Sequence, residues 1–484
     1  MISRRGFLAG GSGLLAGTLL PRSAAADAPP VTVSLNVNAA ARAVVMPVDF
    51  AGLSYESAQL ANPEFFAASN TALVEKVRSL AQQGVLRLGG SLSDFTLWGG
   101  PDAPPPSPAE QEAVDNRARA YREWQLVDAV VAARRRAVIT PEAIHQLRAF
   151  LDATGWSLLY GLNFGSGTPQ QAAAEAAYVQ QALGPRLPAF QFGNEADFYG
   201  GGHRPKPWEF EQYWADYQRF AAAVKQRVPQ ARFAGPDVAV RMDWVRDYAE
   251  KAKGEAVLLT GHYYAMGPPD DPQMNAERLL HEDPKLAGLL QQSAEAAAIA
   301  GVPYRMSEGN SCYHGGKPGV SDRFASALWG ADFMLRLAQA GSAGVNFHGG
   351  GDSAYAPIAG DREQGFSERP LYHGMQFIRP LAGCRFLGCA LQSNGVNLTA
   401  YAAEGADGRW LALINKDRRA VRVALAGPSL QEQALRGVWR LAAPSPDSSY
   451  ASLSFAEATD QERLAAAYGG LNVSAYSAVL ARFN

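Results

Sequence analysis

Between residues 48 and 350, short apolar runs alternate with longer stretches in which apolar residues recur at helical spacing. The short runs predict buried strands and the longer stretches predict helices. The eight predicted strands occupy residues 48–56, 85–91, 156–164, 189–195, 232–238, 257–265, 304–310 and 343–350. Eight strands that alternate with helices over roughly 300 residues predict an α/β fold, the (β/α)8 or TIM barrel, rather than an open sheet.

Two of the predicted helices carry clear end signals. Thr140 and Pro141 suit the N-cap and the first helical position, and Gly155 suits the end of that helix. A second helix is predicted to begin at Ser321 and to end at Gly341, because the apolar residues between them fall on one face. Both helices fit the connections between barrel strands.

The two ends of the chain follow a different pattern, in which apolar and polar residues alternate one by one. This period of two predicts strands at residues 31–38 and in much of the last stretch of the chain. We therefore expect an accessory antiparallel β-sandwich made of residues 381–484, joined by the N-terminal segment 27–47, and a barrel over residues 48–380.

The first 26 residues have the layout of a twin-arginine export signal. Arg4 and Arg5 precede an apolar run over residues 6–20, and a small residue, Ala26, suits the cleavage site. The run is too short to span a membrane, so we expect a periplasmic or secreted protein with no membrane attachment after cleavage. A buried N-terminal helix is the alternative.

The charge balance argues against a polyanionic partner. The whole chain carries a net charge of −2, and without residues 1–26 it would carry 41 basic and 46 acidic residues, a net charge of −5. Such a balance is not the signature of a nucleic-acid-binding protein. We therefore expect no nucleic-acid partner.

The chain contains three cysteines, Cys312, Cys384 and Cys389. An odd number cannot form a complete disulfide framework, although the sequence leaves open whether Cys384 pairs with Cys389. No Cys/His cluster has the spacing of a zinc site. We expect neither a metal ion nor an organic cofactor.

Polar residues stand at or just after the ends of most predicted strands. In a (β/α)8 barrel these ends meet at one mouth, where the active site lies. The residues are Glu56, Ser91, Asp94, Asn163, Asn194, Glu195, His262, Tyr264, Glu308, Asn310 and His348. The fourth and seventh strands lie across the ring from each other, so Glu195 and Glu308 are expected to face one another. Two carboxylates at one barrel mouth suggest glycoside hydrolysis.

Six motifs in order along the chain strengthen this interpretation. They read LRLGGSLSDF, LLYGLNFG, QFGNEADFY, GHYY, SEGNSCYHGG and GVNFHGGGDSAY, between residues 48 and 380. A GNE sequence after the fourth strand and a glutamate on the seventh resemble the retaining glycosidases with a (β/α)8 barrel. The six motifs together resemble glycoside hydrolase family 79, the β-glucuronidase and heparanase family.

The resemblance implies roles for residues on three strands. Glu195 would be the general acid/base and Glu308 the nucleophile, while Asn194 would hold the 2-hydroxyl of the sugar. His262 and Tyr264 match a pair on the sixth strand that touches the nucleophile.

The resemblance also implies how a glucuronic acid would be held. Its carboxylate would be bound by Tyr313, by the backbone N–H of Gly315 and by Tyr355. Neutral donors can grip a carboxylate without placing a competing cation beside the two catalytic acids. Glu56 matches an acidic position that binds sugar hydroxyls, and Ser91, a further candidate for substrate binding, matches a position with a small hydroxyl residue. His314 departs from the glycine common in heparanase-like members.

These features predict a retaining, exo-acting β-glucuronidase with a carbohydrate substrate, either a glucuronide or a uronic-acid-containing glycan. The closest alternative is a heparanase-like enzyme that cuts heparan sulfate or a related polysaccharide internally. The acidic balance and a proline-rich loop at residues 99–111, able to close one end of a cleft, favour exo action. A non-catalytic carbohydrate-binding barrel is a third alternative.

Overall fold

The computed structural model of the protein describes residues 29–38, 44–104, 136–426 and 433–484, together with residues 108 and 430. The expected export signal and residues 105–107 and 109–111 of the 99–111 loop lie outside these residues. No helix in the described ranges is long and apolar enough to cross a membrane.

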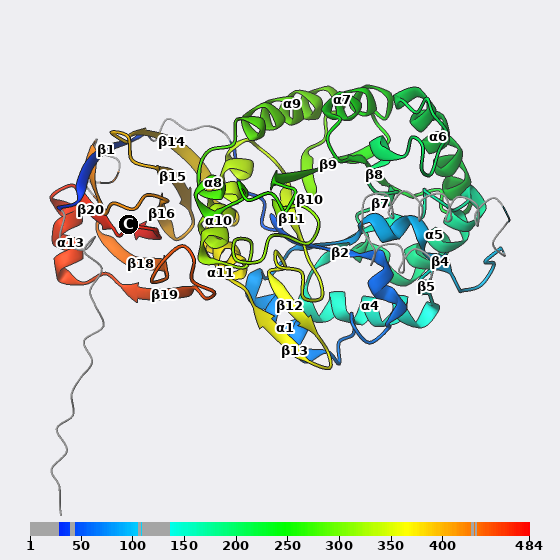
Figure 1. Cartoon of the computed structure of the whole chain (residues 1–484), viewed down its shortest axis with the longest axis horizontal. Coiled ribbons are helices and arrows are strands. Elements are labelled where there is room, and N and C mark those ends of the chain that lie inside the picture. The colour runs from blue at the N-terminus through cyan, green and yellow to red at the C-terminus, as the bar shows by residue number, and fades with distance from the viewer. Residues whose placement is uncertain (1–28, 39–43, 105–107, 109–135, 427–429, 431–432) are drawn as a thin grey trace, which may run out of the picture.

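The eight predicted strands form one closed parallel barrel, and their order around it is their order along the chain (Figure 1). They are β2 (Ala51–Glu56), β3 (Val85–Gly89), β6 (Ser157–Leu162), β7 (Ala189–Phe192), β8 (Phe233–Val238), β9 (Ala256–Met266), β10 (Tyr304–Cys312) and β11 (Gly344–His348). The (β/α)8 prediction is confirmed.

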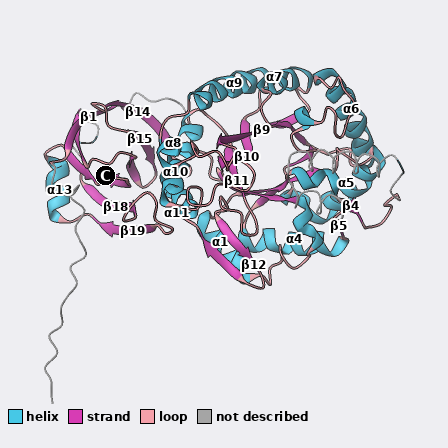
Figure 2. Ribbon diagram, viewed as in Figure 1, coloured by secondary structure: helices cyan, strands magenta, loops and turns pink. Residues whose placement is uncertain are grey.

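Helices surround the barrel strands (Figure 2). They include α1 (Thr71–Leu80), α4 (Pro141–Thr154), α5 (Pro169–Leu183), α6 (Phe210–Arg227), α7 (Met242–Lys251), α8 (Ala276–Leu280), α9 (Pro284–Ala300), α10 (Phe324–Gln339) and α11 (Pro370–Phe377). The ends predicted for α4 are confirmed: the Thr140 hydroxyl accepts a hydrogen bond from the N–H of Ala143, and Gly155 follows with φ 80°.

The helix α10 begins three residues later than the sequence predicts. Arg323, in an extended conformation, is its N-cap, whereas Ser321 lies in the preceding turn. The Ser321 hydroxyl is engaged there, because it contacts the hydroxyl of Ser311 and accepts a hydrogen bond from the N–H of Lys317. These contacts fix Ser321 outside the helix.

The interior of the barrel has an apolar layer below a polar one. The apolar cluster consists of Val85, Leu159, Ala189 and Ala234, and it is separate from the main core. Val85 and Arg87 are two residues apart on β3 and share a face, so Arg87 points into the barrel above this cluster. The apolar layer thus closes the barrel beneath the polar side chains at its mouth.

The accessory domain is one continuous sheet of nine strands with its own core. Besides β1 (Val31–Asn38) it contains β14 (Arg385–Gln392), β15 (Leu398–Gly405), β16 (Gly408–Asn415), β17 (Val421–Ala426), β18 (Leu435–Ala442), β19 (Ser452–Glu457), β20 (Gly470–Val473) and β21 (Ser477–Phe483). The N-terminal strand β1 lies between β14 and β17 in this sheet. Among these described strands the pairings are antiparallel except that β1 runs parallel to β17.

A buried carboxylate on α10 ties the barrel to this sheet. Asp332 accepts hydrogen bonds of 2.6 Å from Thr399, Tyr401 and Lys416, which belong to β15 or follow β16. The cysteines, by contrast, make no covalent link: Cys312, Cys384 and Cys389 are all free thiols.

Candidate active site

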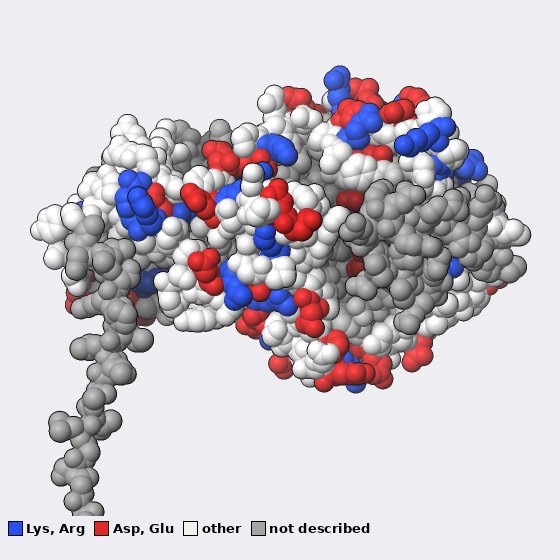
Figure 3. Space-filling view, in the orientation of Figure 1, with Lys and Arg blue, Asp and Glu red and all other residues white. Residues whose placement is uncertain are grey.

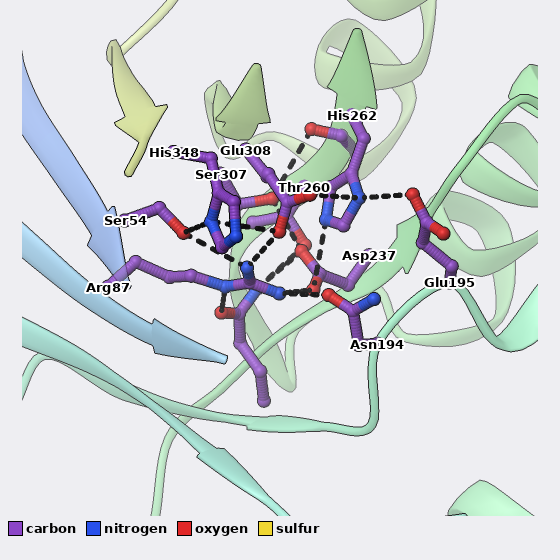
Figure 4. Close-up of polar contacts among 12 residues, drawn as sticks. Ser54, Arg87, Asn194, Glu195, Asp237, Thr260, His262, Ser307, Glu308 and His348 are labelled. Atoms are coloured by element: carbon purple, nitrogen blue, oxygen red, sulfur yellow. Dashed lines mark hydrogen bonds and ion pairs between the residues drawn. The ribbon is translucent and has the colours of Figure 1, made fainter. Parts of the chain in front are cut away.

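Arg87, fully buried on β3, is the centre of a polar network at the barrel mouth (Figure 4). Its Nη1 donates to Oε2 of Glu308 at 2.6 Å and to the hydroxyl of Ser54 at 3.1 Å. Its Nη2 donates to Oδ2 of Asp237 at 2.6 Å and to Oδ1 of Asn194 at 2.7 Å. One planar guanidinium therefore fixes two carboxylates and the amide of Asn194 at once.

Glu308 is a buried carboxylate on β10 that stays ionised. Besides Arg87, the hydroxyl of Tyr264 donates to its Oε1 at 2.8 Å. Burial alone would raise the pKa of Glu308. The charges of His348, His262 and Arg87, with the hydrogen bond from Tyr264, outweigh burial and lower this pKa to about 2.

Glu195 is more accessible than Glu308, with a side chain 23% exposed against 7%. It follows β7 in the left-handed region, at φ 51°, and its N–H donates to the carbonyl of Asp237 at 2.9 Å. This conformation directs its carboxylate toward His262, whose Nδ1 lies 3.0 Å from Oε1. Glu195 therefore combines a fixed backbone with access to solvent.

His262 on β9 lies among three carboxylates. Its Nδ1 is 3.0 Å from Glu195 and 3.8 Å from Glu308, and its Nε2 is 3.3 Å from Oδ2 of Asp237. Burial would lower the pKa of His262, but the charges of Glu308 and Asp237, with the close contacts to Asp237 and Glu195, raise it to about 10. The imidazole is therefore a cation at neutral pH.

Glu195, His262 and Glu308 each offer one atom, and these atoms lie within 4.8 Å of one another. Such spacing could hold a metal ion. However, a protonated imidazole has no free lone pair for a metal, and Arg87 already supplies a positive charge to Glu308. The described side chains fit a network of ion pairs better than a metal site.

A second histidine, His348 at the end of β11, stands on the other side of Glu308. Its Nδ1 lies 2.9 Å from the hydroxyl of Ser54 and 3.5 Å from Oε2 of Glu308. Its Nε2 lies 3.8 Å from Glu56, which ends β2 and accepts a hydrogen bond from the N–H of Leu92. Ser91, beside Leu92, begins the 3-10 helix η3 (Ser91–Phe95), so the structure brings it near Glu56.

The tyrosines of the site gather around Tyr264. Its ring lies 6.4 Å from that of Tyr313 and 6.2 Å from that of Tyr355. The N–H of Tyr355 donates to the carbonyl of Gly315 at 3.3 Å, and Gly315 has φ 83°. The loop after β10 is thereby held beside the residue that donates to Glu308.

Sequence analysis missed two charged residues of the network, Arg87 and Asp237. Both lie within predicted strands, and the signal was a charged side chain inside an apolar run, in LRL and in GPDV. Two other strand-end residues hold neighbouring loops in place. Asp94 accepts hydrogen bonds from the hydroxyl of Tyr199 and the N–H of Gly165, and Asn163 donates to the carbonyl of Thr96.

Several known proteins resemble the chain, although no family model matches it. A β-glucuronidase of Aspergillus niger is 22% identical over 373 residues, which are 70% of this chain and 64% of the relative. A β-glucuronidase of Neurospora crassa is 26% identical over 44% of each chain. Heparanase-like protein 3 of Arabidopsis thaliana is 22% identical over 59% of this chain and 53% of its own. The matches thus span between 44% and 64% of these relatives' lengths.

Solved structures share the architecture of both domains. A 4-O-α-L-rhamnosyl-β-D-glucuronidase from Fusarium oxysporum superposes with a TM-score of 0.68 at 17% identity, over 93% of this chain and all of that one. An α-L-arabinofuranosidase from Thermotoga maritima gives 0.64 at 14% identity, over 93% and 99%.

The fold therefore places the chain among (β/α)8 barrels with an accessory β-sheet domain. Within that class, the curated relatives confirm the resemblance to the β-glucuronidase and heparanase family that the strand-end motifs indicated.

Proposed function

We propose that the protein is a retaining β-glucuronidase in which Glu308 is the nucleophile and Glu195 the general acid/base. The observation that carries this proposal is the contrast between two neighbouring glutamates. Glu308 is buried and held ionised, whereas Glu195 is more exposed, and one oxygen of each lies within 4.8 Å of the other. Carboxyl groups of retaining glycosidases are about 5–5.5 Å apart, while inverting enzymes leave a wider gap for water.

The reaction would take place in two displacements. In the first, the Glu308 carboxylate attacks the anomeric carbon while protonated Glu195 gives its proton to the leaving oxygen, so that the glycosidic bond breaks and a sugar ester of Glu308 forms. In the second, ionised Glu195 takes a proton from water, whose oxygen attacks the same carbon and releases Glu308. The hydrogen bond from Tyr264 and the ion pair with Arg87 aim the nucleophile.

Asn194 is placed to assist at the sugar 2-hydroxyl. Arg87 occupies its Oδ1, so its amide nitrogen points the other way and can donate (Figure 4). A hydrogen bond at this hydroxyl strengthens as the oxocarbenium-like transition state develops.

A glucuronide is the substrate class that the site and the curated relatives support best. Tyr313, the N–H of Gly315 and Tyr355 would bind the sugar carboxylate, and Glu56 and Ser91 would bind hydroxyls. The positive φ of Gly315 suits this role, because a residue without a side chain lets a ligand approach the backbone.

Exo action is favoured over cleavage within a sulfated polysaccharide. Several basic residues of the described loops at the barrel mouth are already engaged: Arg204 pairs with Asp216, Arg241 pairs with acids, and Lys317 donates to a backbone carbonyl. Basic and acidic side chains are interspersed on the face that Figure 3 shows. A sulfated chain would be better served by a continuous basic groove.

We also infer export through the twin-arginine route, which rests on Arg4, Arg5 and the apolar run that follows them. An exported enzyme would meet glucuronides or glycan ends outside the cytoplasm.

The test compares two substrates with the wild-type protein and the E308Q variant. The wild type should release glucuronic acid from an aryl β-glucuronide and should leave the chain length of heparan sulfate unchanged, and E308Q should release none. Shortening of heparan sulfate without release of the monosaccharide would favour the heparanase-like alternative. Binding of glucuronides without any hydrolysis would favour a carbohydrate-binding barrel.

A further inference from the structure

Asp237 on β8 is a fully buried carboxylate to which the proposed mechanism assigns no step. Its Oδ2 accepts a 2.6 Å hydrogen bond from Arg87 and lies 3.3 Å from Nε2 of His262. Its Oδ1 accepts hydrogen bonds from Gln191, at 2.7 Å, and from Ser307. All the polar contacts of this carboxylate therefore run to the network beneath the two glutamates (Figure 4).

We propose that Asp237 is a positioning residue that sets both glutamates, Glu308 through Arg87 and Glu195 through His262. This proposal rests on the proposed function of the two glutamates. It adds a residue that touches neither the substrate nor the reacting atoms.

The first arm of this arrangement is the guanidinium. Asp237 and Asn194 share Nη2 of Arg87, and Glu308 and Ser54 share Nη1. Because the guanidinium is rigid and planar, anchoring one nitrogen fixes the direction of the other. Asp237 therefore determines where Arg87 holds the nucleophile.

The second arm is the imidazolium. The charged groups that face His262 are Glu195 after β7, Asp237 on β8 and Glu308 on β10, with Arg87 on β3 behind Asp237. Glu195 and Glu308 both lie on the Nδ1 side, so Asp237 is the carboxylate that faces Nε2. It keeps both ring nitrogens protonated and leaves the Nδ1 hydrogen directed at Glu195.

The backbone of Asp237 makes a third contact of the same kind. Its carbonyl accepts the N–H of Glu195, and both residues lie in the left-handed region, at φ 63° and φ 51°. Residues other than glycine rarely adopt this conformation, and those that do cluster at functional sites. Asparagine also tolerates it well, so D237N removes the charge without opposing the backbone.

The direct test is the protonation state of His262, followed by NMR of 15N-histidine-labelled protein. The chain has seven histidines, and the spectrum of H262Q assigns the signal. In the wild type, both nitrogens should remain protonated at pH 7.5. In D237N, the pH at which His262 loses its positive charge should fall by about 1–3 units. With an aryl β-glucuronide, kcat should fall by about 100-fold with a smaller change in KM, as expected for a displaced catalytic group.

D94N is the matched control, since Asp94 is also a buried carboxylate near the mouth. It should leave the His262 transition in place even if it lowers stability. A His262 that is neutral in the wild type at pH 7.5 would overturn the proposal, and this measurement does not require D237N to fold. So would an unchanged His262 transition and kcat in D237N. Because the NMR readout needs no turnover, a failure of the glucuronidase assignment would appear separately, in the activity of the wild type.

Discussion

Nη1 of Arg87 lies 2.6 Å from Oε2 of Glu308, and both side chains are buried. Through this contact, a strand on one side of the barrel fixes the carboxylate that we assign as the nucleophile. The same guanidinium also holds Asn194 and Asp237, so its shape should matter as well as its charge.

The R87K variant tests the shape of this group. Lysine keeps the charge but cannot reach two pairs of acceptors with a rigid fork, so we expect kcat to fall by about 100-fold with a smaller change in KM. Steady-state kinetics with an aryl β-glucuronide provide the measurement. R305K is the control, because Arg305 is equally buried but binds Asn346 and backbone carbonyls. An equal loss of kcat in both variants would count against a specific role for Arg87.

The hydroxyl of Tyr264 should affect the pH profile. Its hydrogen bond helps to hold the pKa of Glu308 low, so the Y264F variant should raise that pKa. Since Glu308 must be ionised to attack, the acid limb of kcat/KM should move to higher pH. The neighbouring residue offers the control: the Tyr263 hydroxyl donates to Asp283, so Y263F should leave the limb in place. If the acid limb of kcat/KM stayed in place in Y264F, the Tyr264 hydroxyl would not be holding the pKa of Glu308 low.

The stability of the junction between the two domains should depend on the carboxylate of Asp332. Burial would raise the pKa of Asp332, but the charges of Lys416 and Arg336 and hydrogen bonds from Lys416 and Thr399 lower it to about 2. This stabilisation is present above the unfolded value near 3.8 and is lost as the pH falls toward 2. D332N should lower the free energy of unfolding at pH 7 by about 3 kcal/mol.

Urea denaturation at pH 7 measures the effect of D332N. E282Q is the control, because Glu282 also pairs with Arg336 but its side chain is 66% exposed. This variant should lower the free energy of unfolding by less than about 1 kcal/mol. Equal decreases in the free energy of unfolding of the two variants would show that the burial of Asp332 does not determine its contribution to stability.

The contribution of Glu175 on α5 to stability should depend on pH in the opposite sense to that of Asp332. Burial raises its pKa to about 7, although the Tyr160 hydroxyl donates to it at 2.6 Å. The folded protein keeps this proton between about pH 4.5 and 7 while the unfolded chain loses it, so stability falls as the pH rises through that window. E175Q should therefore raise the free energy of unfolding at pH 8 but not at pH 4. The exposed Glu142 provides the control, and a gain in E142Q of the same size would refute the explanation.

The barrel could be predicted because each of its strands is a short apolar run with polar residues at its end. The same pattern predicts Glu195 and Glu308 at one mouth, and one oxygen of each lies within 4.8 Å of the other. The pairing of β1 with β17 could not be predicted, since a period of two identifies the buried face of a strand but not its neighbour or direction.

Arg87 and Asp237 were missed for a related reason. A charged residue within a strand appears unfavourable until closure of the barrel brings an opposite charge beside it. Arg87 and Asp237 lie 150 residues apart in sequence, and only the closed barrel brings Nη2 of Arg87 within 2.6 Å of Oδ2 of Asp237.

As the proposed nucleophile, Glu308 should form a covalent bond with glucuronic acid during the reaction. Incubation with 2-deoxy-2-fluoro-β-glucuronosyl fluoride, followed by mass spectrometry of the intact protein and its peptides, tests it most directly, because the fluorine slows release of the ester. We expect one glycosyl adduct per chain, on the peptide that contains Glu308. An adduct on Glu195, or turnover of glucuronides without any adduct, would contradict it.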